Sequence, residues 1–185
     1  MIVLKTIYLV RHCSATGQAP NAALTSTGLQ QAQDLVSFFE NKEVKHILSS
    51  PYLRAQQSIM PAAISKQLEI QIESRLAERI LSDIDIPDWM TQLEQTFTDL
   101  DLKLPGGESS REATARGVEV IKEVPNHSIL VTHGNLMRLI LKHFDDSFGF
   151  QEWKSLSNPD VYMLTIDHTT TNISRVWNEK SNTPT

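Results

Sequence analysis

Two short apolar segments end in the same unusual way, and they constrain the fold more than any other feature of the chain. Ile7–Val10 runs directly into Arg11 and His12, and Ile129–Val131 is followed after one residue by His133. Segments that are apolar at every position are typical of strands buried on both faces, as in a parallel sheet. The carboxyl ends of parallel strands meet at one edge of the sheet, where α/β proteins bind their ligands. We therefore expect these basic side chains to converge on one crevice.

The rest of the chain alternates between strand-like and helix-like segments. Strands are predicted at Lys5–Val10, His46–Ser49, Leu68–Ile72, Ser128–Thr132, Val161–Ile166 and Asn172–Trp177. Helices are predicted at Thr25–Asn41, Tyr52–Gln67, Trp89–Leu100, Ser109–Glu123 and Asn135–Phe144. This alternation predicts a three-layer α/β/α sandwich with a mostly parallel central sheet. We expect a single domain over residues 1–178 and a polar tail over residues 179–185.

Three local signals refine the helix boundaries. Thr27 with Gln30, and Ser109 with Glu112, have the spacing of capping boxes at helix starts. Pro61 lies inside the second predicted helix and is expected to kink it or to end its first half, because proline removes a backbone donor.

Composition limits the class of protein. The 185 residues are 40% hydrophobic and 21% charged, as in an ordinary soluble globular protein. The net charge of −5, without a clustered basic face, argues against nucleic-acid binding. The apolar opening stretch is too short for a membrane span and lacks a signal-peptide cleavage site. A single cysteine excludes an internal disulfide, which is typical of a reducing compartment, so we predict a cytoplasmic protein. From the charge and the short apolar stretch, we expect it to bind neither nucleic acid nor membrane. The oligomeric state is left open.

The basic residues at the strand ends are suited to binding phosphate. Arg54 is expected in the first turn of the helix that follows His46–Ser49, which would bring it to the same crevice as Arg11. Guanidinium groups bind phosphate oxygens in a fixed fork geometry. The N-terminus of the helix after Gly134 adds backbone donors. A neutral imidazole in such a site can attack phosphorus while the arginines neutralise the developing charge.

Six short motifs carry a resemblance to a known family. They are "LVRH", "LTSTGLQQA", "SSPYLRAQQS", "RLAER", "PGGES" and "VTHGN", in this order over about Ile7 to Asn135. In combination they resemble the histidine phosphatase superfamily, also called phosphoglycerate mutase-like proteins.

The resemblance implies a phosphoglycerate mutase-like fold and a phosphomonoester hydrolase. His12 would be the nucleophile that becomes a phosphohistidine, and Glu78 would be the general acid and base. Arg11, Arg54 and His133 would bind the phosphoryl group. Neither a cofactor nor a metal is implied, and the substrate would be a small phosphorylated compound or a phosphoprotein.

The loop after His12 departs from the family's most familiar form, R-H-G-[EQ]-[ST]. Cys13 replaces the glycine, and Ala15 stands where the phosphate-binding hydroxyl is usual. We predict that Ser14 or Thr16 takes over that role, and that Gly134 also contacts phosphate. Cys13 has two interpretations: a small inert residue packed beside the site, or a thiol whose pKa falls near the cationic groups and whose oxidation stops activity.

Other interpretations of these residues remain open. A phosphoglycerate mutase-type phosphotransferase is the near alternative, and a non-catalytic phosphate- or phosphoprotein-binding module is the rival from another class. A metal site built from His12, Cys13, Glu78 and His133 has suitable ligand types, but the arginines would repel a cation. Glu108 is expected to bind backbone amides or to position an arginine.

Overall fold

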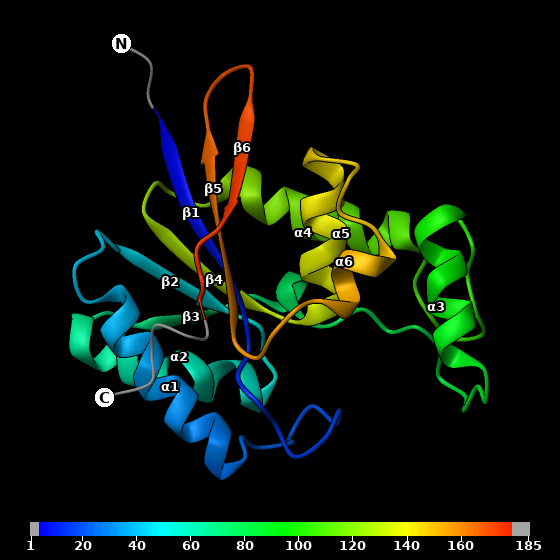
Figure 1. Ribbon diagram of the computed structural model, residues 1–185, viewed down its shortest axis with the longest axis horizontal. Coiled ribbons are helices and arrows are strands. Elements are labelled where there is room, and N and C mark those ends of the chain that lie inside the picture. The colour runs from blue at the N-terminus through cyan, green and yellow to red at the C-terminus, as the bar shows by residue number, and fades with distance from the viewer. Residues whose placement is uncertain (1–3, 179–185) are drawn as a thin grey trace.

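The central feature of the fold is one six-stranded sheet with the strand order β3-β2-β4-β1-β5-β6 (Figure 1). The structure is a computed structural model and describes residues 4–178. The strands are β1 (Lys5–Arg11), β2 (His46–Ser49), β3 (Ile70–Ile72), β4 (Ser128–Thr132), β5 (Asp160–Ile166) and β6 (Thr171–Arg175).

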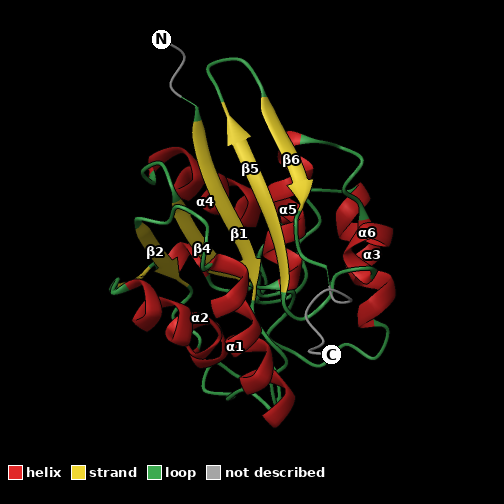
Figure 2. Cartoon of the chain, turned by 60° about the vertical axis from the view of Figure 1, so that its left-hand side comes forward, coloured by secondary structure: helices red, strands yellow, loops and turns green. Residues whose placement is uncertain are grey.

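Helices cover both faces of this sheet. They are α1 (Ser26–Phe39), α2 (Leu53–Lys66), α3 (Trp89–Thr98), α4 (Ser110–Glu123), α5 (Gly134–Phe144) and α6 (Phe150–Lys154). Figure 2 shows α1 and α2 on one face, and α4 and α5 on the other. The molecule is therefore a three-layer α/β/α sandwich, as the alternation of segments predicts. No helix in the described part of the chain is long and apolar enough to span a membrane.

The apolar run of β1 is needed because this strand faces two cores. Ile7 and Leu9 pack in the core that includes residues of α4 and α5. Tyr8 and Val10 pack in the other core, with residues of α1 and α2. Side chains alternate between the two faces along a strand, so a strand covered on both faces must be apolar at every position.

The pairing of β1 with β4 places the two histidines. The strands are parallel neighbours, and Arg11 lies opposite Thr132 in the register. The His12 amide donates to the Thr132 carbonyl over 3.1 Å. His12 and His133 therefore leave the same edge of the sheet side by side, as the matching strand ends predict.

The last two strands run against the parallel part of the sheet. β1 pairs antiparallel with β5, and β5 pairs antiparallel with β6, whereas β3, β2, β4 and β1 pair in parallel. The four residues 167–170 that connect β5 and β6 can form a hairpin, but they are too few for a parallel crossover.

Some local predictions are confirmed and others are wrong. The capping box of Ser109 and Glu112 is present at the start of α4. The box predicted at Thr27 and Gln30 is wrong, because Thr25 caps α1 by accepting a hydrogen bond from the Gly28 amide.

The remaining corrections concern helices. Pro61 lies within α2, which continues to Lys66, so the proline does not end the helix. The short helix α6 was not predicted from the sequence. The predicted polar tail, 179–185, lies outside the described residues.

Candidate active site

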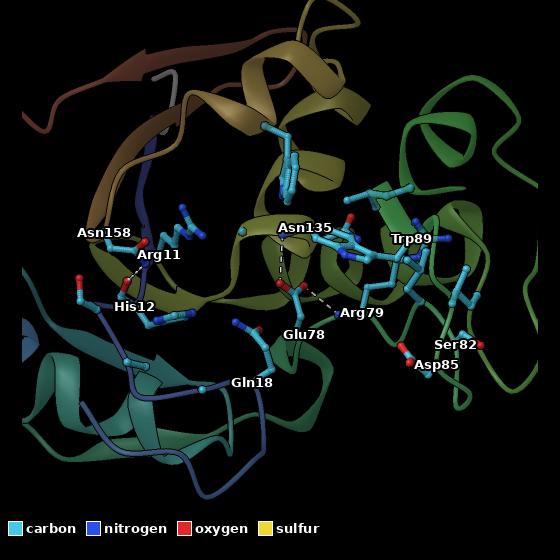
Figure 3. A pocket seen from close by; sticks show the side chains of 18 of the residues that line it. Arg11, His12, Gln18, Glu78, Arg79, Ser82, Asp85, Trp89, Asn135 and Asn158 are labelled. Atoms are coloured by element: carbon cyan, nitrogen blue, oxygen red, sulfur yellow. Dashed lines mark hydrogen bonds between the residues drawn. The ribbon is translucent and has the colours of Figure 1, made fainter. Parts of the chain in front are cut away.

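A cavity of about 620 Å³ opens where β1 and β4 end. Its walls come from three parts of the chain: the loop after β1, the segment from Glu78 to Leu93, and the region from Gly134 to Asn158. In Figure 3, Arg11, His12 and Asn158 lie on one side of the cavity, Glu78 lies in the middle, and Trp89, Ser82 and Asp85 lie on the far side. Its size suits a small-molecule site.

His12 stands at the end of β1 with one ring nitrogen fixed by the backbone. Nδ1 lies 2.7 Å from the carbonyl oxygen of Cys13, so Nδ1 carries the proton and donates it. Nε2 is then an acceptor, and it accepts a hydrogen bond from Nε of Arg54 over 3.2 Å. The Asn158 side-chain amide donates to the His12 carbonyl oxygen over 2.8 Å. The ring therefore presents a lone pair on Nε2.

The surroundings keep this imidazole neutral. Burial, reinforced by the charges of Arg54 and Arg11, lowers the pKa of His12 from 6.5 to about 4. The hydrogen bond to Cys13 opposes this shift without reversing it. At neutral pH the Nε2 lone pair is consequently available to a nucleophilic reaction.

Two arginines flank His12. Arg54, in the first turn of α2, is 1% exposed, and its Nη1 donates to the carbonyl oxygens of Gln18 and Ala19. Arg11 donates from Nη1 to the carbonyl oxygens of Leu156 and Ser157. The Nε of Arg11 is buried and has no hydrogen-bond partner among the described residues.

Gly134 is the residue against which the Arg11 guanidinium packs. A Cβ placed on Gly134 would lie 3.1 Å from Arg11 Nε and 3.2 Å from its Cζ. A side chain here would require the guanidinium to shift by a few tenths of an ångström. Gly134 also lines the cavity, so glycine at the start of α5 is explained by this close approach.

His133 is fully buried next to His12, and their ring centroids are 5.1 Å apart. Its Nε2 lies 2.7 Å from the Ser50 hydroxyl, whereas its Nδ1 is buried and unpartnered within the described chain. Burial and the nearby His12 and arginines lower the pKa of His133 well below its ordinary value, so this ring is also neutral. It lies behind the surface of the cavity and is not one of the lining residues.

Glu78 is held by the N-terminus of α5. Its Oε1 accepts from the Leu136 amide at 2.9 Å, and its Oε2 accepts from the Asn135 amide at 3.0 Å. Oε1 also accepts from the amide of Arg79 at 2.8 Å. The side chain of α5's own N-cap residue makes no capping hydrogen bond. Glu78 therefore occupies backbone amides at the start of α5 that we expected to bind phosphate, and its carboxylate acts as a hydrogen-bond acceptor.

The two hydroxyls predicted to bind phosphate lie in different environments. Ser14 lines the cavity. Thr16 does not line it, because its hydroxyl and its amide both bond to the Ala23 carbonyl oxygen. A short antiparallel bridge between Ala15 and Leu24 fixes this turn of the loop. The structure therefore does not bring Thr16 to the site.

The structure decides between the two interpretations of Cys13. Its side chain is fully buried in the apolar core beneath α1 and α2 and does not line the cavity. Burial raises the pKa of its thiol to about 12. The expected lowering of the thiol pKa by nearby cations is therefore wrong, because burial dominates and no cation of the described chain contributes to the shift.

An ion pair between Glu108 and Arg116 supports the segment that leads to Glu78. Glu108 forms a two-point ion pair with Arg116 at 2.8 and 2.9 Å, and Arg116 also donates to the carbonyl oxygens of Arg75 and Ala77. Glu108 thus positions an arginine, as predicted, and does not line the cavity.

Several lining residues escaped the sequence analysis. They are Gln18, Arg79, Leu81, Ser82, Ile84, Ile86, Trp89, Leu93, Asn135, Trp153 and Asn158. Arg79 and Asn135 end the motifs "RLAER" and "VTHGN", but most of the others belong to the segments 81–93 and 153–158, whose sequences carry no recognisable motif. Nothing in the sequence marks Trp89 and Ile84, which the structure shows to be 46% and 57% exposed beside the cavity.

Comparison with known proteins identifies relatives of the chain. A family model described as the histidine phosphatase superfamily, branch 1, matches residues 7–179. Among curated proteins, a probable phosphoglycerate mutase GpmB of Shigella dysenteriae is 27% identical over 148 residues, which cover 69% of each chain.

Solved structures share the fold at low sequence identity. YhfR of Bacillus stearothermophilus has a TM-score of 0.74 at 22% identity, covering 92% of this chain and 96% of its own. A mycobacterial glucosyl-3-phosphoglycerate phosphatase has a TM-score of 0.73 at 18% identity, covering 95% and 99%. The α-ribazole phosphatase of Shigella flexneri has a TM-score of 0.72 at 18% identity, covering 92% and 95%. The fold is therefore phosphoglycerate mutase-like.

Proposed function

Because the chain belongs to the histidine phosphatase superfamily, we propose that it hydrolyses phosphate monoesters through a phosphohistidine on His12. The observation that carries this proposal is the fixed tautomer of His12. Its Nδ1–H is bound to the Cys13 carbonyl, its pKa is lowered to about 4, and its Nε2 lone pair lies beside the Arg54 guanidinium. Nε2 is unprotonated and lines the cavity side of the ring pair, and its hydrogen-bond donor is a guanidinium, which can transfer its hydrogen bond to a phosphoryl oxygen when Nε2 attacks phosphorus.

The first half of the reaction transfers the phosphoryl group to His12. Nε2 forms a bond to phosphorus, the bond from phosphorus to the leaving oxygen breaks, and that oxygen takes the electron pair and a proton. Phosphate monoesters bind their last proton with a pKa of about 6, so a monoprotonated substrate can supply it. Glu78 accepts this proton and passes it to the leaving oxygen, which suits a carboxylate presented as an acceptor.

Positive charge near His12 stabilises the transferred group. Arg54 Nε already donates to His12 Nε2 over 3.2 Å, so it lies within reach of a phosphoryl oxygen bonded to that nitrogen. The unpartnered Nε of Arg11 is a second donor. Preorganised donors of this kind stabilise the charge that develops in the transition state. Ser14 and Gly134 line the same end of the cavity, and His133 would contribute from behind His12.

The second half releases phosphate. Water attacks phosphorus, Glu78 takes the proton from the water, and the electron pair of the nitrogen–phosphorus bond returns to Nε2. Glu78 then gives this proton to the departing phosphate or to solvent, which restores the carboxylate. The route needs neither a metal nor a cofactor, because imidazole, guanidinium and carboxylate groups supply the nucleophile, the charge and the proton transfer.

The test compares His12→Ala with wild-type protein on a generic aryl phosphate. We expect kcat to fall by at least about 1,000-fold, because the covalent route is lost. His168→Ala, in the exposed turn between β5 and β6, is the matched histidine control and should retain wild-type activity. Equal low activity in all three proteins would refute the phosphatase and favour a non-catalytic phosphate-binding module.

A mutase is the second candidate, since the curated relative is a probable phosphoglycerate mutase. Both activities pass through a phosphoenzyme, and they differ in the acceptor. A labelled phosphoenzyme that releases inorganic phosphate to water in the absence of an acceptor identifies the hydrolase. A phosphoenzyme that persists until a phosphoglycerate is added identifies the mutase.

A further inference from the structure

The far side of the cavity differs in chemistry from the end that holds His12. Five apolar side chains of the segment 81–93 line it, and we call them the distal wall: Leu81, Ile84, Ile86, Trp89 and Leu93. Figure 3 shows Trp89 across the cavity from His12, with Glu78 between them. A group attached to a phosphate on His12 would therefore extend past Glu78 toward this wall.

The distal wall is apolar where it is open to solvent. Trp89 is 46% exposed and Ile84 is 57% exposed, and both line the cavity. Water contact with such surface is unfavourable, at about 25 cal/mol per Å². Exposed apolar surface that continues a catalytic cavity marks a ligand-binding surface.

A second tryptophan contributes to the same cavity. Trp153 lines it from α6 and stacks on Phe150, with ring centroids 5.5 Å apart and an angle of 16° between the rings. Phe150 in turn contacts Phe97 of α3 at 6.0 Å. Trp153 is therefore held by aromatic packing, and it provides a preformed flat surface for an aromatic ring.

Among the described residues that line the cavity, Arg79 is the one cationic side chain of the segment 79–93, and it is not available to a second anionic group. It is only 4% exposed. Its Nε and Nη2 bond the Glu108 carbonyl oxygen, and its Nη1 bonds the Thr96 and Ser110 hydroxyls. The titratable group that the segment does present is the Asp85 carboxylate, which repels an anion.

From these observations, and resting on the proposed function, we infer that the distal wall binds the leaving group of the substrate, and that this group is apolar or aromatic and carries no second anion. The substrate is then a small phosphate monoester of an apolar alcohol or phenol. A phosphorylated sugar acid or a bisphosphate would place its second anion against Asp85 and apolar side chains.

The decisive comparison uses three esters of primary alcohols, so that their intrinsic reactivity is similar. They are 2-phenylethyl phosphate, glycerol 1-phosphate and 3-phosphoglycerate. Burial of the phenyl ring on the distal wall should raise kcat/KM for 2-phenylethyl phosphate about 10- to 100-fold above glycerol 1-phosphate. 3-Phosphoglycerate should be the poorest of the three. An equal or higher kcat/KM for 3-phosphoglycerate overturns the inference.

Two pairs of variants assign the effect to the wall. The first pair uses the ratio of kcat/KM for 2-phenylethyl phosphate to kcat/KM for glycerol 1-phosphate. Trp89→Ala should lower this ratio about 10-fold. Met90→Ala, which changes an exposed neighbour outside the cavity, should leave the ratio unchanged. Asp85→Lys should raise the relative kcat/KM for 3-phosphoglycerate about 5-fold or more, and Asp88→Lys, which makes the same charge change outside the cavity, should not. Equal effects within either pair would contradict the assignment.

A binding measurement separates this inference from the proposed reaction. In His12→Ala protein, calorimetry should show a lower Kd for 2-phenylethyl phosphate than for 3-phosphoglycerate, whether or not the wild type hydrolyses either. If the wild type does not hydrolyse either ester but the affinities follow this order, only the proposed reaction is rejected. If 3-phosphoglycerate binds more tightly, or if neither ester binds, the inference is rejected. A phosphotyrosine peptide that is hydrolysed with a higher kcat/KM than phenyl phosphate would overturn the assignment to a small molecule.

Discussion

At the scale of single residues, the environment of Cys13 shows why a side chain directly after the proposed nucleophile does not enter the cavity. The Cys13 amide donates to the Ser58 hydroxyl at 2.8 Å, its carbonyl holds His12 Nδ1, and its side chain turns into the core. The backbone thus supports the active imidazole while the thiol faces away from the cavity.

We expect this thiol to be inert in the folded protein. Because burial raises its pKa to about 12, almost no thiolate exists at pH 8. Iodoacetamide at pH 8 should leave Cys13 unmodified in native protein and should modify it fully in urea, as measured by intact mass. Peroxide at moderate doses should leave phosphatase activity unchanged. Rapid alkylation of the native protein would show that the thiol is accessible.

The residue scale also shows what the sequence could and could not reveal about the site. His12, His133, Arg11 and Arg54 were predictable because strand ends and a first helical turn fix their direction. Thr16 was misplaced, because a tertiary bridge between Ala15 and Leu24 turns its hydroxyl away. Distant residues such as Asn158 become part of the site only through tertiary contacts, and no local pattern marks them.

At the scale of elements, α5 depends on a residue far away in the sequence. Its first amides are bound by the Glu78 carboxylate, and a negative charge near a helix N-terminus is stabilising. The proposed proton-transfer group is therefore also the cap of the helix that follows β4. This coupling was not predictable, because capping motifs read from sequence are local.

Replacing Glu78 should therefore cost stability as well as activity. Glu78→Ala leaves the amides of Asn135 and Leu136 without their acceptor, so the free energy of unfolding should fall by about 1–3 kcal/mol. Urea unfolding followed by circular dichroism measures this change. Glu94→Ala, an exposed glutamate in α3, is the matched control and should change stability by no more than about 0.5 kcal/mol. An unchanged or raised stability in Glu78→Ala would mean that the cap contributes nothing.

Element boundaries were predictable where local chemistry decides them. The start of α4 follows from the Ser109 and Glu112 capping box. α6 escaped prediction because five residues are too few to show helical periodicity. Its place is set instead by the stacking of Phe150 and Trp153 and by the contact with Phe97.

At the scale of the whole molecule, the parallel pairing of the central strands was predictable, but the antiparallel pairing of β5 and β6 was not. Apolar strands separated by helices require parallel neighbours, which is how β3, β2, β4 and β1 pair. The hairpin of β5 and β6 was not predicted, although the short connection 167–170 contains that information.

The sandwich also buries two neutral histidines where β1 and β4 end, which links the stability of the whole molecule to pH. His12 is 7% exposed with a pKa lowered to about 4, and burial also lowers the pKa of His133 well below its ordinary value. In the unfolded chain both rings bind protons below about pH 6.5. The unfolded state therefore holds more protons than the folded state in this range, so stability rises with pH there.

We expect the free energy of unfolding to be highest above pH 6.5 and to decline as the pH falls toward 4. The shift of His12 alone corresponds to about 3 kcal/mol over this interval. Urea unfolding at a series of pH values between 4.5 and 7.5 measures the slope. His12→Ala should flatten it, because one of the two groups that bind protons only on unfolding is gone, and His168→Ala should leave it as in wild type, because that ring is exposed in the folded state. A slope that is equal in wild type and His12→Ala would show that the folded protein accepts a proton on this imidazole, and would remove the neutral nucleophile on which the proposed reaction depends.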